Sequence, residues 1–75
     1  MTRDTIYDRL REIGCSVETA DATAEALEGM SDMKVEAFIL WACGMNNCEV
    51  AREIGKSEHY VRGIIRSVCK LVELC

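Results

Sequence analysis

Apolar residues recur every three or four positions along most of the chain, and interruptions divide this pattern into five segments. Such spacing places apolar side chains on one face of a helix, so each segment is predicted to be helical. A residue that caps helices precedes each segment, and glycine follows four of them. The expected helices follow Thr2, Ser16, Ser31, Asn46 and Ser57, and the first four end at Gly14, Gly29, Gly44 and Gly55. The expected fold class is therefore all-α, a small bundle of five helices.

The first two expected helices are short and amphipathic, and together they form a predicted hairpin. Their apolar stripes are Ile6, Leu10 and Ile13 in the first helix and Val17, Ala20, Ala24 and Leu27 in the second. Helices of this length are not stable alone in water, so the hairpin must pack against the rest of the chain.

The third expected helix carries an unbroken apolar run at residues 37–43. A helix that is apolar on every side must be covered on several sides, so we expect it to be the central post of the bundle. Phe38 and Trp41 are expected in the core. The alternative role for Trp41 is to bind a ligand that stacks on its ring.

The last expected helix has no helix breaker before Cys75, and its second half is apolar on more than one face. Either the amino-terminal hairpin or a second copy of the chain covers those faces. Exposed apolar area usually marks an interface, so a homodimer is expected. The residues expected at the dimer interface are Ile65, Cys69, Val72 and Leu74.

The stretch from Asn46 to Val68 has the features of a helix-turn-helix. Asn46 and Glu49 have the spacing of a capping box. Gly55 tolerates the left-handed backbone that ends a helix, and Ser57 caps the next helix. The apolar seam between the two helices would consist of Val50, Ala51, Ile54, Val61, Ile64 and Val68. This combination favours a steeply crossed helix-turn-helix over a plain helical hairpin.

Several of these residues also carry a resemblance to a known family. The matching residues are Met30, Ser31, Gly44, Asn47, Glu49, Val50, Ala51, Ser57, Val61 and Arg62. Through them, residues 30–72 resemble the DNA-binding domain of LuxR-type regulators and region four of bacterial sigma factors. The sequence departs from that pattern at Lys56, where an apolar residue is usual, and at Ile64, where LuxR-type proteins often have histidine. The resemblance implies a transcriptional regulator that binds double-stranded DNA with the helix after Ser57.

The length of 75 residues predicts a single domain, 1–75, close to the lower size limit for folding without a disulfide or a metal. The net charge of −4 is distributed unevenly. Residues 1–29, the acidic hairpin, contain seven acids and three bases, whereas residues 30–75 contain six of each. From residue 50 to residue 72 there are five bases and two acids. The overall charge therefore does not exclude DNA binding by the carboxy-terminal part.

The five cysteines predict neither a disulfide framework nor a metal site, because their number is odd and no CxxC pair is present. They are expected to be small core-filling thiols, except that Cys75 could cross-link two chains in air. A single histidine cannot complete a zinc site at any familiar spacing. No cofactor is predicted.

No apolar run approaches the roughly 20 residues that a membrane-spanning helix needs. The first ten residues lack the basic segment and apolar core of a signal peptide. The chain is therefore expected in the cytoplasm, without a membrane partner.

The helix after Ser57 is the expected DNA-reading helix. His59, Arg62, Arg66 and Lys70 recur at spacings of three and four and so share one face. Near the amino end of the helix, Arg62 and His59 are best placed to reach base edges, where arginine can donate two hydrogen bonds to guanine. Arg66 and Lys70 are expected at phosphates. Residues at the helix starts or beside this face complete the predicted DNA-binding set: Asn46, Asn47, Lys56, Ser57, Tyr60 and Gly63.

Alternatives remain open at this point. The basic face could be a solvated surface in which Glu58 pairs with Arg62. The chain could also be a protein-binding module on a helix-turn-helix scaffold, for example a phage or mobile-element antagonist or adaptor of a host protein. Such a module would use the acidic amino-terminal hairpin or the apolar last helix. An enzyme is not expected, because no nucleophile has a matched base and orienting group in the pattern.

The hairpin and the predicted helix-turn-helix share a short internal echo. Arg-Glu-Ile-Gly followed by serine occurs at residues 11–16 and again at 52–57. Continuing the alignment pairs Ala20 with Val61 and Leu27 with Val68. Chance convergence is favoured over a duplication, since helices that end at glycine and restart at serine are common.

Overall fold

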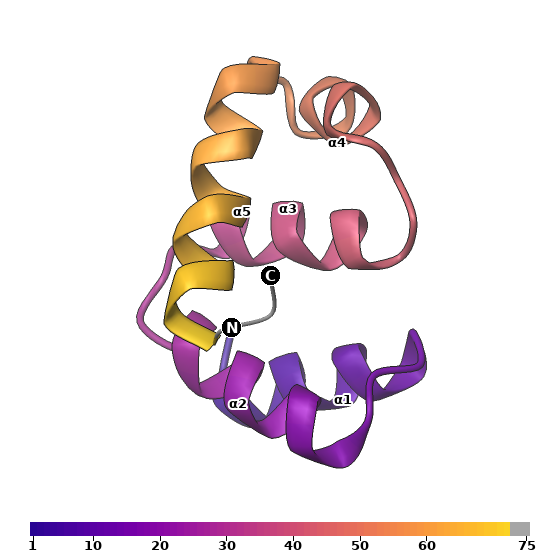
Figure 1. Cartoon of the computed structure of the whole chain (residues 1–75), viewed down its shortest axis with the longest axis vertical. Helices are drawn as coiled ribbons and strands as arrows, with labels where there is room; N and C mark the ends of the chain where they lie inside the picture. Colours follow the sequence, from indigo (N-terminus) through magenta and orange to yellow (C-terminus); the bar gives the residue numbers. More distant parts are fainter. Residues whose placement is uncertain (73–75) are drawn as a thin grey trace.

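The computed structural model describes residues 1–72 and contains five α-helices and no strand in that range. The helices are α1 (Arg3–Glu12), α2 (Val17–Leu27), α3 (Asp32–Ala42), α4 (Asn47–Ile54) and α5 (Glu58–Val72). The expected all-α class and all five helices are confirmed (Figure 1). Each helix begins directly after the residue that the sequence predicts as its cap.

The caps explain why the helices begin where they do. The hydroxyl oxygens of Thr2 and Ser16 accept hydrogen bonds from the backbone N–H of Thr5 (3.3 Å) and Thr19 (3.2 Å). These bonds satisfy amide groups that have no partner within the helix. Ser31 stands at the expected cap position of α3, but its side chain makes no capping hydrogen bond.

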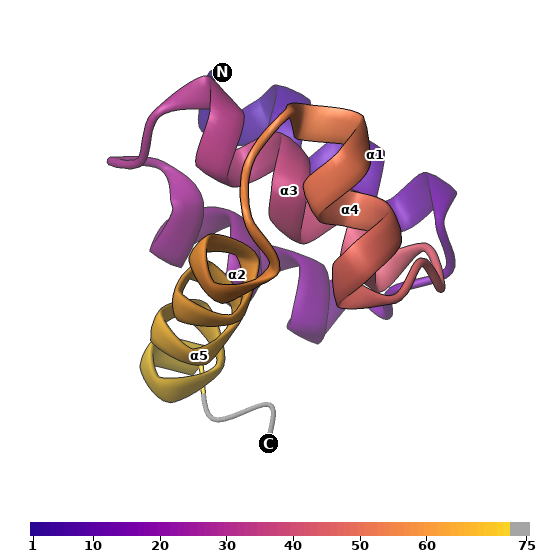
Figure 2. The same cartoon turned by 90° about the horizontal axis from the view of Figure 1, so that it is seen from above.

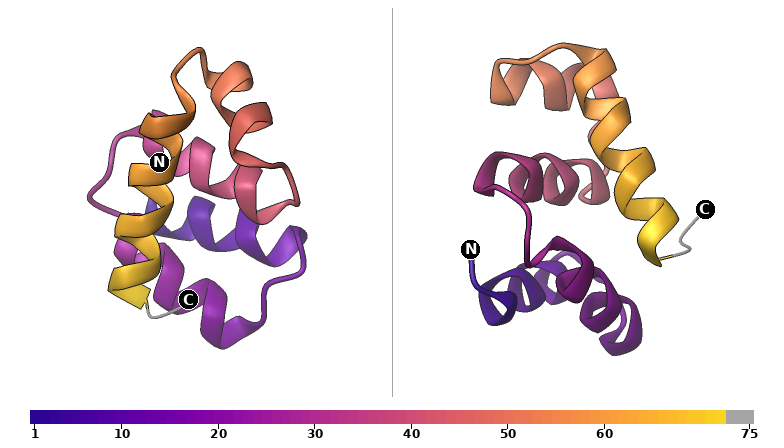
Figure 3. Two further views of the ribbon diagram at one scale, coloured as in Figure 1. Left: turned by 45° about the horizontal axis from the view of Figure 1, so that its top comes forward. Right: turned by 90° about the vertical axis from the view of Figure 1, so that its left-hand side faces the viewer.

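The helices are stacked in tiers. The hairpin α1–α2 forms one end, α3 lies in the middle and α4 forms the other end, as the right-hand view of Figure 3 shows. α5 runs along one side of this stack and packs against α2, α3 and α4 (Figures 1 and 2). The amino-terminal hairpin and the α4–α5 turn therefore lie at opposite ends of the molecule.

The core is continuous through all five helices and includes Ile6, Leu10, Ala20, Leu27, Val35, Phe38, Ile39, Val50, Val61 and Val68. α3 packs against α1, α4 and α5, whereas α2 packs against α1 and α5. The expected central role of α3 is thus shared with α5. Phe38 is buried as predicted, and its ring lies 5.6 Å from that of Trp41.

Three expectations about the core are wrong. Trp41 is only half-buried, and its side chain lines an open groove. Val17 is 55% exposed, because it lies in the first turn of α2 at the edge of the bundle. The cysteines do not all fill the core: Cys69 is buried and Cys15 half-buried, but Cys43 and Cys48 are exposed beside the α3–α4 turn. Leu74 and Cys75 lie outside the described residues.

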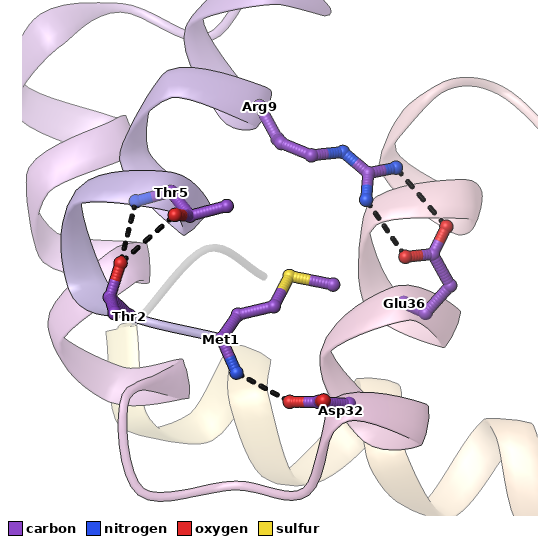
Figure 4. Close-up of polar contacts among 6 residues, drawn as sticks. All are labelled: Met1, Thr2, Thr5, Arg9, Asp32 and Glu36. Atoms are coloured by element: carbon purple, nitrogen blue, oxygen red, sulfur yellow. Dashed lines mark hydrogen bonds and ion pairs between the residues drawn. The ribbon is translucent and has the colours of Figure 1, made fainter.

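Ion pairs attach the hairpin to α3 (Figure 4). Arg9 donates two hydrogen bonds to Glu36, at 2.8 and 3.1 Å, and the amino-terminal ammonium group pairs with Asp32. Glu36 raises the pKa of Arg9 above its ordinary value, mainly through the side-chain hydrogen bond. Both partners are more than a third exposed, so this pair contributes at most about 1 kcal/mol to stability. Buried apolar contacts therefore dominate the attachment of the hairpin.

None of the helices in the part of the chain that the structure describes has the length and apolar character needed to cross a bilayer.

Candidate nucleic-acid interface

The α4–α5 unit (residues 46–72) is organised by the predicted local signals. Asn46 and Glu49 form the capping box: each side chain accepts a hydrogen bond from the other's backbone N–H, at 2.8 and 3.3 Å. α4 ends at Gly55, whose φ of 72° is left-handed and favours glycine. The Ser57 hydroxyl then accepts a hydrogen bond from the backbone N–H of Tyr60 at 3.1 Å.

The expected seam fixes how α5 is rotated about its own axis. Val50 and Ala51 of α4 are buried, as are Val61, Ile64 and Val68 of α5. In Figure 1, α4 is seen almost end-on, whereas α5 runs from top to bottom in the plane of the picture, so the two helices point in clearly different directions. Because one side of α5 is held by this seam, the other side faces solvent.

The solvent side of α5 carries the predicted basic residues. Five exposed residues make up what we call the α5 arc: His59, Arg62, Gly63, Arg66 and Lys70. Arg62 is 61% exposed and pairs with Glu58 at 2.6 Å, the intrahelical pair considered as an alternative from the sequence. Within residues 1–72, no acidic side chain pairs with Arg66 or Lys70. The amino-terminal hairpin packs elsewhere and leaves the α5 arc uncovered.

A groove lies on each side of the α5 arc. The first, which we call the Trp41 groove, is lined by Trp41, Asn47, Arg62, Ile65, Arg66, Cys69 and Lys70. The second, the Lys34 groove, is lined by Met30, Lys34, His59, Tyr60, Gly63, Ile64 and Ser67. The α5 arc is thus a ridge with cationic side chains on both flanks.

The predicted residues at the helix starts are near this ridge, but their side chains are partly engaged. The Asn46 side-chain oxygen is used by the capping box, while Asn47 lines the Trp41 groove. The Lys56 ammonium lies 5.7 Å from the centre of the Tyr60 ring. The π electrons of an aromatic ring attract a cation that lies over the face of the ring, so Tyr60 holds Lys56 near the start of α5.

The residues predicted for a dimer interface do not form one exposed surface. Ile65 and Cys69 are buried within the single chain and form the bottom of the Trp41 groove. Val72 is half-buried next to Leu71, which is 64% exposed. Leu71 and Val72 border a shallow depression with Ala22, Glu25 and Ala26 of α2. Leu71 belongs to the apolar second half of the last helix and is the most exposed large apolar residue of α5, but it was not among the residues predicted at the dimer interface.

The acidic residues that follow one face of the second hairpin helix line neither of the two grooves beside the α5 arc. Glu18, Asp21 and Glu25 are exposed on α2, Glu28 is exposed directly after it, and Asp21 pairs with Arg3 of α1. Nowhere in residues 1–72 do three histidine, cysteine or acidic side chains come together in an arrangement that could hold a metal ion.

Two residues of the candidate interface were missed by sequence reasoning. Lys34 of α3 lies beside His59 and Tyr60, and Trp41 lies beside Arg62 and Arg66. Only the tertiary packing brings α3 to both flanks of α5. The apolar run at residues 37–43 did contain a signal for Trp41. A helix that is apolar on all sides has more apolar surface than the other helices of so small a chain can bury, so one of its large side chains is expected to stay partly exposed.

Comparison of the chain with protein-family models, with curated proteins and with solved structures finds no match. The resemblance of residues 30–72 to LuxR-type and sigma-factor domains therefore remains a prediction from the residues that carry it.

Proposed function

We propose that this chain is a helix-turn-helix protein that binds double-stranded DNA and regulates transcription. The observation that carries the proposal is the α5 arc. It is an uncovered ridge of His59, Arg62, Arg66 and Lys70, held from behind by a buried apolar seam. An α-helix presented in this way fits the major groove of B-DNA, which is about 12 Å wide.

Each cation has a role according to its place on the ridge. Arg62 and His59 lie in the first half of α5 and are assigned to base edges. Arg66 and Lys70 lie further along, on the flank formed by the Trp41 groove, and are assigned to phosphates. Lys34 in the Lys34 groove and Lys56 over the Tyr60 ring would meet phosphates on the opposite flank, where the start of α5 also offers backbone N–H groups.

A homodimer is part of the proposal, since paired subunits read two half-sites of a duplex. The surface that favours it is the depression between α2 and α5, where Leu71, Val72, Ala22 and Ala26 lie beside one carboxylate, that of Glu25. The mass of the reduced protein in solution tests this point, and a monomer at micromolar concentration would remove it.

The test of DNA binding is titration of a fluorescent random-sequence duplex of about 20 base pairs at several salt concentrations. Removing one phosphate contact lowers the slope of log affinity against log salt by about 0.9, because one counterion fewer is released. Replacing Lys70 with glutamine should therefore weaken binding to all sequences and flatten the slope by about one unit. The matched control is Arg11→Gln, which makes the same charge change on α1 and should leave the slope unchanged.

Base reading is tested separately, by selecting bound sequences from the random pool. Arg62→Gln should reduce the preference at one base position, because a bidentate arginine–guanine contact supplies about 1–3 kcal/mol of discrimination. Absence of salt-dependent binding by the unaltered protein, even at low salt, would refute the proposal as a whole.

The second candidate function is a protein-binding module on the same scaffold. The observation that favours it is charge: the whole chain carries −4, and three exposed acids lie on α2 with a fourth, Glu28, directly after it. This negative surface disfavours approach to DNA at long range. A chain that binds no duplex at any salt concentration would favour this candidate.

A further inference from the structure

The Trp41 groove combines two kinds of surface that a phosphate backbone does not need together. Its floor is apolar and consists of Trp41, Ile65 and Cys69. Along one edge stand three cations, Arg62, Arg66 and Lys70. Phosphates would engage the cations and leave the exposed part of the half-buried indole uncovered, together with the small part of Ile65 that the chain leaves accessible. The floor therefore points to an occupant that has apolar side chains as well as negative charge.

The spacing of the cations indicates the shape of that occupant. Arg62, Arg66 and Lys70 are four residues apart on one helix, so they are separated by about 6 Å and span about 12 Å in total. Acidic residues four apart on a second helix have the same repeat. The groove has a volume of about 950 Å³ and is open to solvent. A small-molecule site usually encloses most of its ligand, which this open groove does not.

We propose that the Trp41 groove docks an acidic amphipathic helix of a partner protein. The partner's apolar side chains pack on Trp41 and Ile65, and its acids, repeating every four residues, pair with the cations of the edge. Charge complementarity supports this occupant: within the described residues Arg66 and Lys70 have no acidic partner, and the partner of Arg62 is the exposed Glu58. Helix-in-groove binding of this kind is a common mode of recognition.

Docking has a consequence that rests on the proposed function. Arg62, Arg66 and Lys70 belong both to the α5 arc and to the Trp41 groove. A helix in the groove neutralises the cations assigned to DNA, so partner and duplex compete. The partner would thus release the protein from DNA without any change of its fold.

Trp41 is the only tryptophan of the chain and serves as the reporter of occupancy. The probe is a synthetic, end-capped peptide of about 16 residues, rich in alanine and free of aromatic residues. It carries three glutamates four residues apart, each followed by leucine. Addition of this peptide to the whole chain, without DNA, should shift Trp41 emission to shorter wavelength as the indole is covered. A peptide with serine in place of leucine should produce no shift.

Charge recognition is tested with matched variants of peptide and protein. A peptide with glutamine in place of each glutamate should bind about tenfold more weakly, since each exposed ion pair changes the affinity by up to roughly fivefold. Arg66→Gln should weaken binding of the acidic peptide by about two- to fivefold. Arg52→Gln on α4, outside the groove, should leave it unchanged.

Three results would overturn the proposal. The acidic peptide gives no shift at millimolar concentration, or the glutamine peptide binds equally well, or Trp41 emission shifts when the protein alone is concentrated. The last result would show that a second copy, through its acidic α2, is the occupant. If the peptide binds but does not displace a labelled duplex, the proposed competition between partner and DNA is refuted, while the docking proposal stands. Because the peptide titration contains no DNA, failure of DNA binding and failure of docking are distinguishable.

Discussion

The α1–α2 and α4–α5 units share a local plan but present opposite charges to solvent. Gly14 and Gly55 both have left-handed backbones, with φ of 100° and 72°. Ser16 and Ser57 both accept a hydrogen bond from the backbone N–H three residues later. The short repeat in the amino-acid sequence thus corresponds to a repeat in the structure: in both units a helix ends at glycine, the chain turns, and serine caps the next helix.

The correspondence extends along the second helix of each unit when Ser16 is aligned with Ser57. Four aligned pairs are buried in both helices: Ala20 and Val61, Thr23 and Ile64, Ala24 and Ile65, Leu27 and Val68. At the exposed positions, however, Asp21 and Glu25 stand where α5 has Arg62 and Arg66. Capping and apolar spacing determine the geometry, while the exposed residues are free to set the charge. Only the α4–α5 unit therefore presents a surface suited to an anionic partner.

The largest expected effect on stability is at the aligned positions that are buried in both α2 and α5. Leu27→Ala should lower the free energy of unfolding by about 2–5 kcal/mol and Val68→Ala by roughly 2 kcal/mol, because both side chains are fully buried. Both losses are large for a chain of this size. Urea unfolding, followed by circular dichroism and by Trp41 fluorescence, measures them.

If the two units share one core, both probes should report one coincident transition in each variant. Leu71→Ala is the control, because its side chain is already 64% exposed and should lose little stability. A Leu27→Ala variant that loses helix while Trp41 emission stays native would show that the two units fold independently.

The sequence was sufficient for the helices because each boundary depends on local chemistry. The capping box of Asn46 and Glu49 and the glycine at position 55 need no tertiary partner, and all were predicted. The orientation of α5 also followed from the sequence, since Val61, Ile64 and Val68 mark its buried side.

The second-largest expected effect is at Thr23, the position of α2 that aligns with Ile64. Its hydroxyl oxygen is buried and has no hydrogen-bond partner in the described part of the chain. Thr23→Val keeps the shape of the side chain and removes the unsatisfied group, so stability should rise by about 1 kcal/mol. Thermal unfolding of both proteins measures this difference.

Thr19→Val is the matched control, because the Thr19 hydroxyl accepts a hydrogen bond from Ser16 at 3.0 Å and its loss should bring no gain. If Thr23→Val is less stable than the unaltered chain, the hydroxyl has a partner and the two aligned positions differ in more than size.

Properties that depend on distant contacts were not available from the sequence. Trp41 and Phe38 belong to the same apolar run, yet only Phe38 is fully covered, because coverage depends on where α5 crosses α3. For the same reason, Lys34 could not be placed beside His59. A one-dimensional pattern shows which side of a helix is apolar, but it does not show how far a neighbouring helix extends over that side.

The smallest expected effect compares Gly63 of α5 with Ala22, its aligned position in α2. A Cβ atom added at Gly63 would meet nothing within 4 Å, so Gly63→Ala should raise the free energy of unfolding by about 0.5–1 kcal/mol. Ala22→Gly should lower it by a similar amount, because the same change is made in reverse on an exposed helix position. A stabilised Gly63→Ala variant that binds duplex more weakly would indicate that DNA approaches α5 closely at this residue. Unchanged duplex affinity in that variant would exclude a close approach there and would leave the cationic side chains as the proposed DNA contacts.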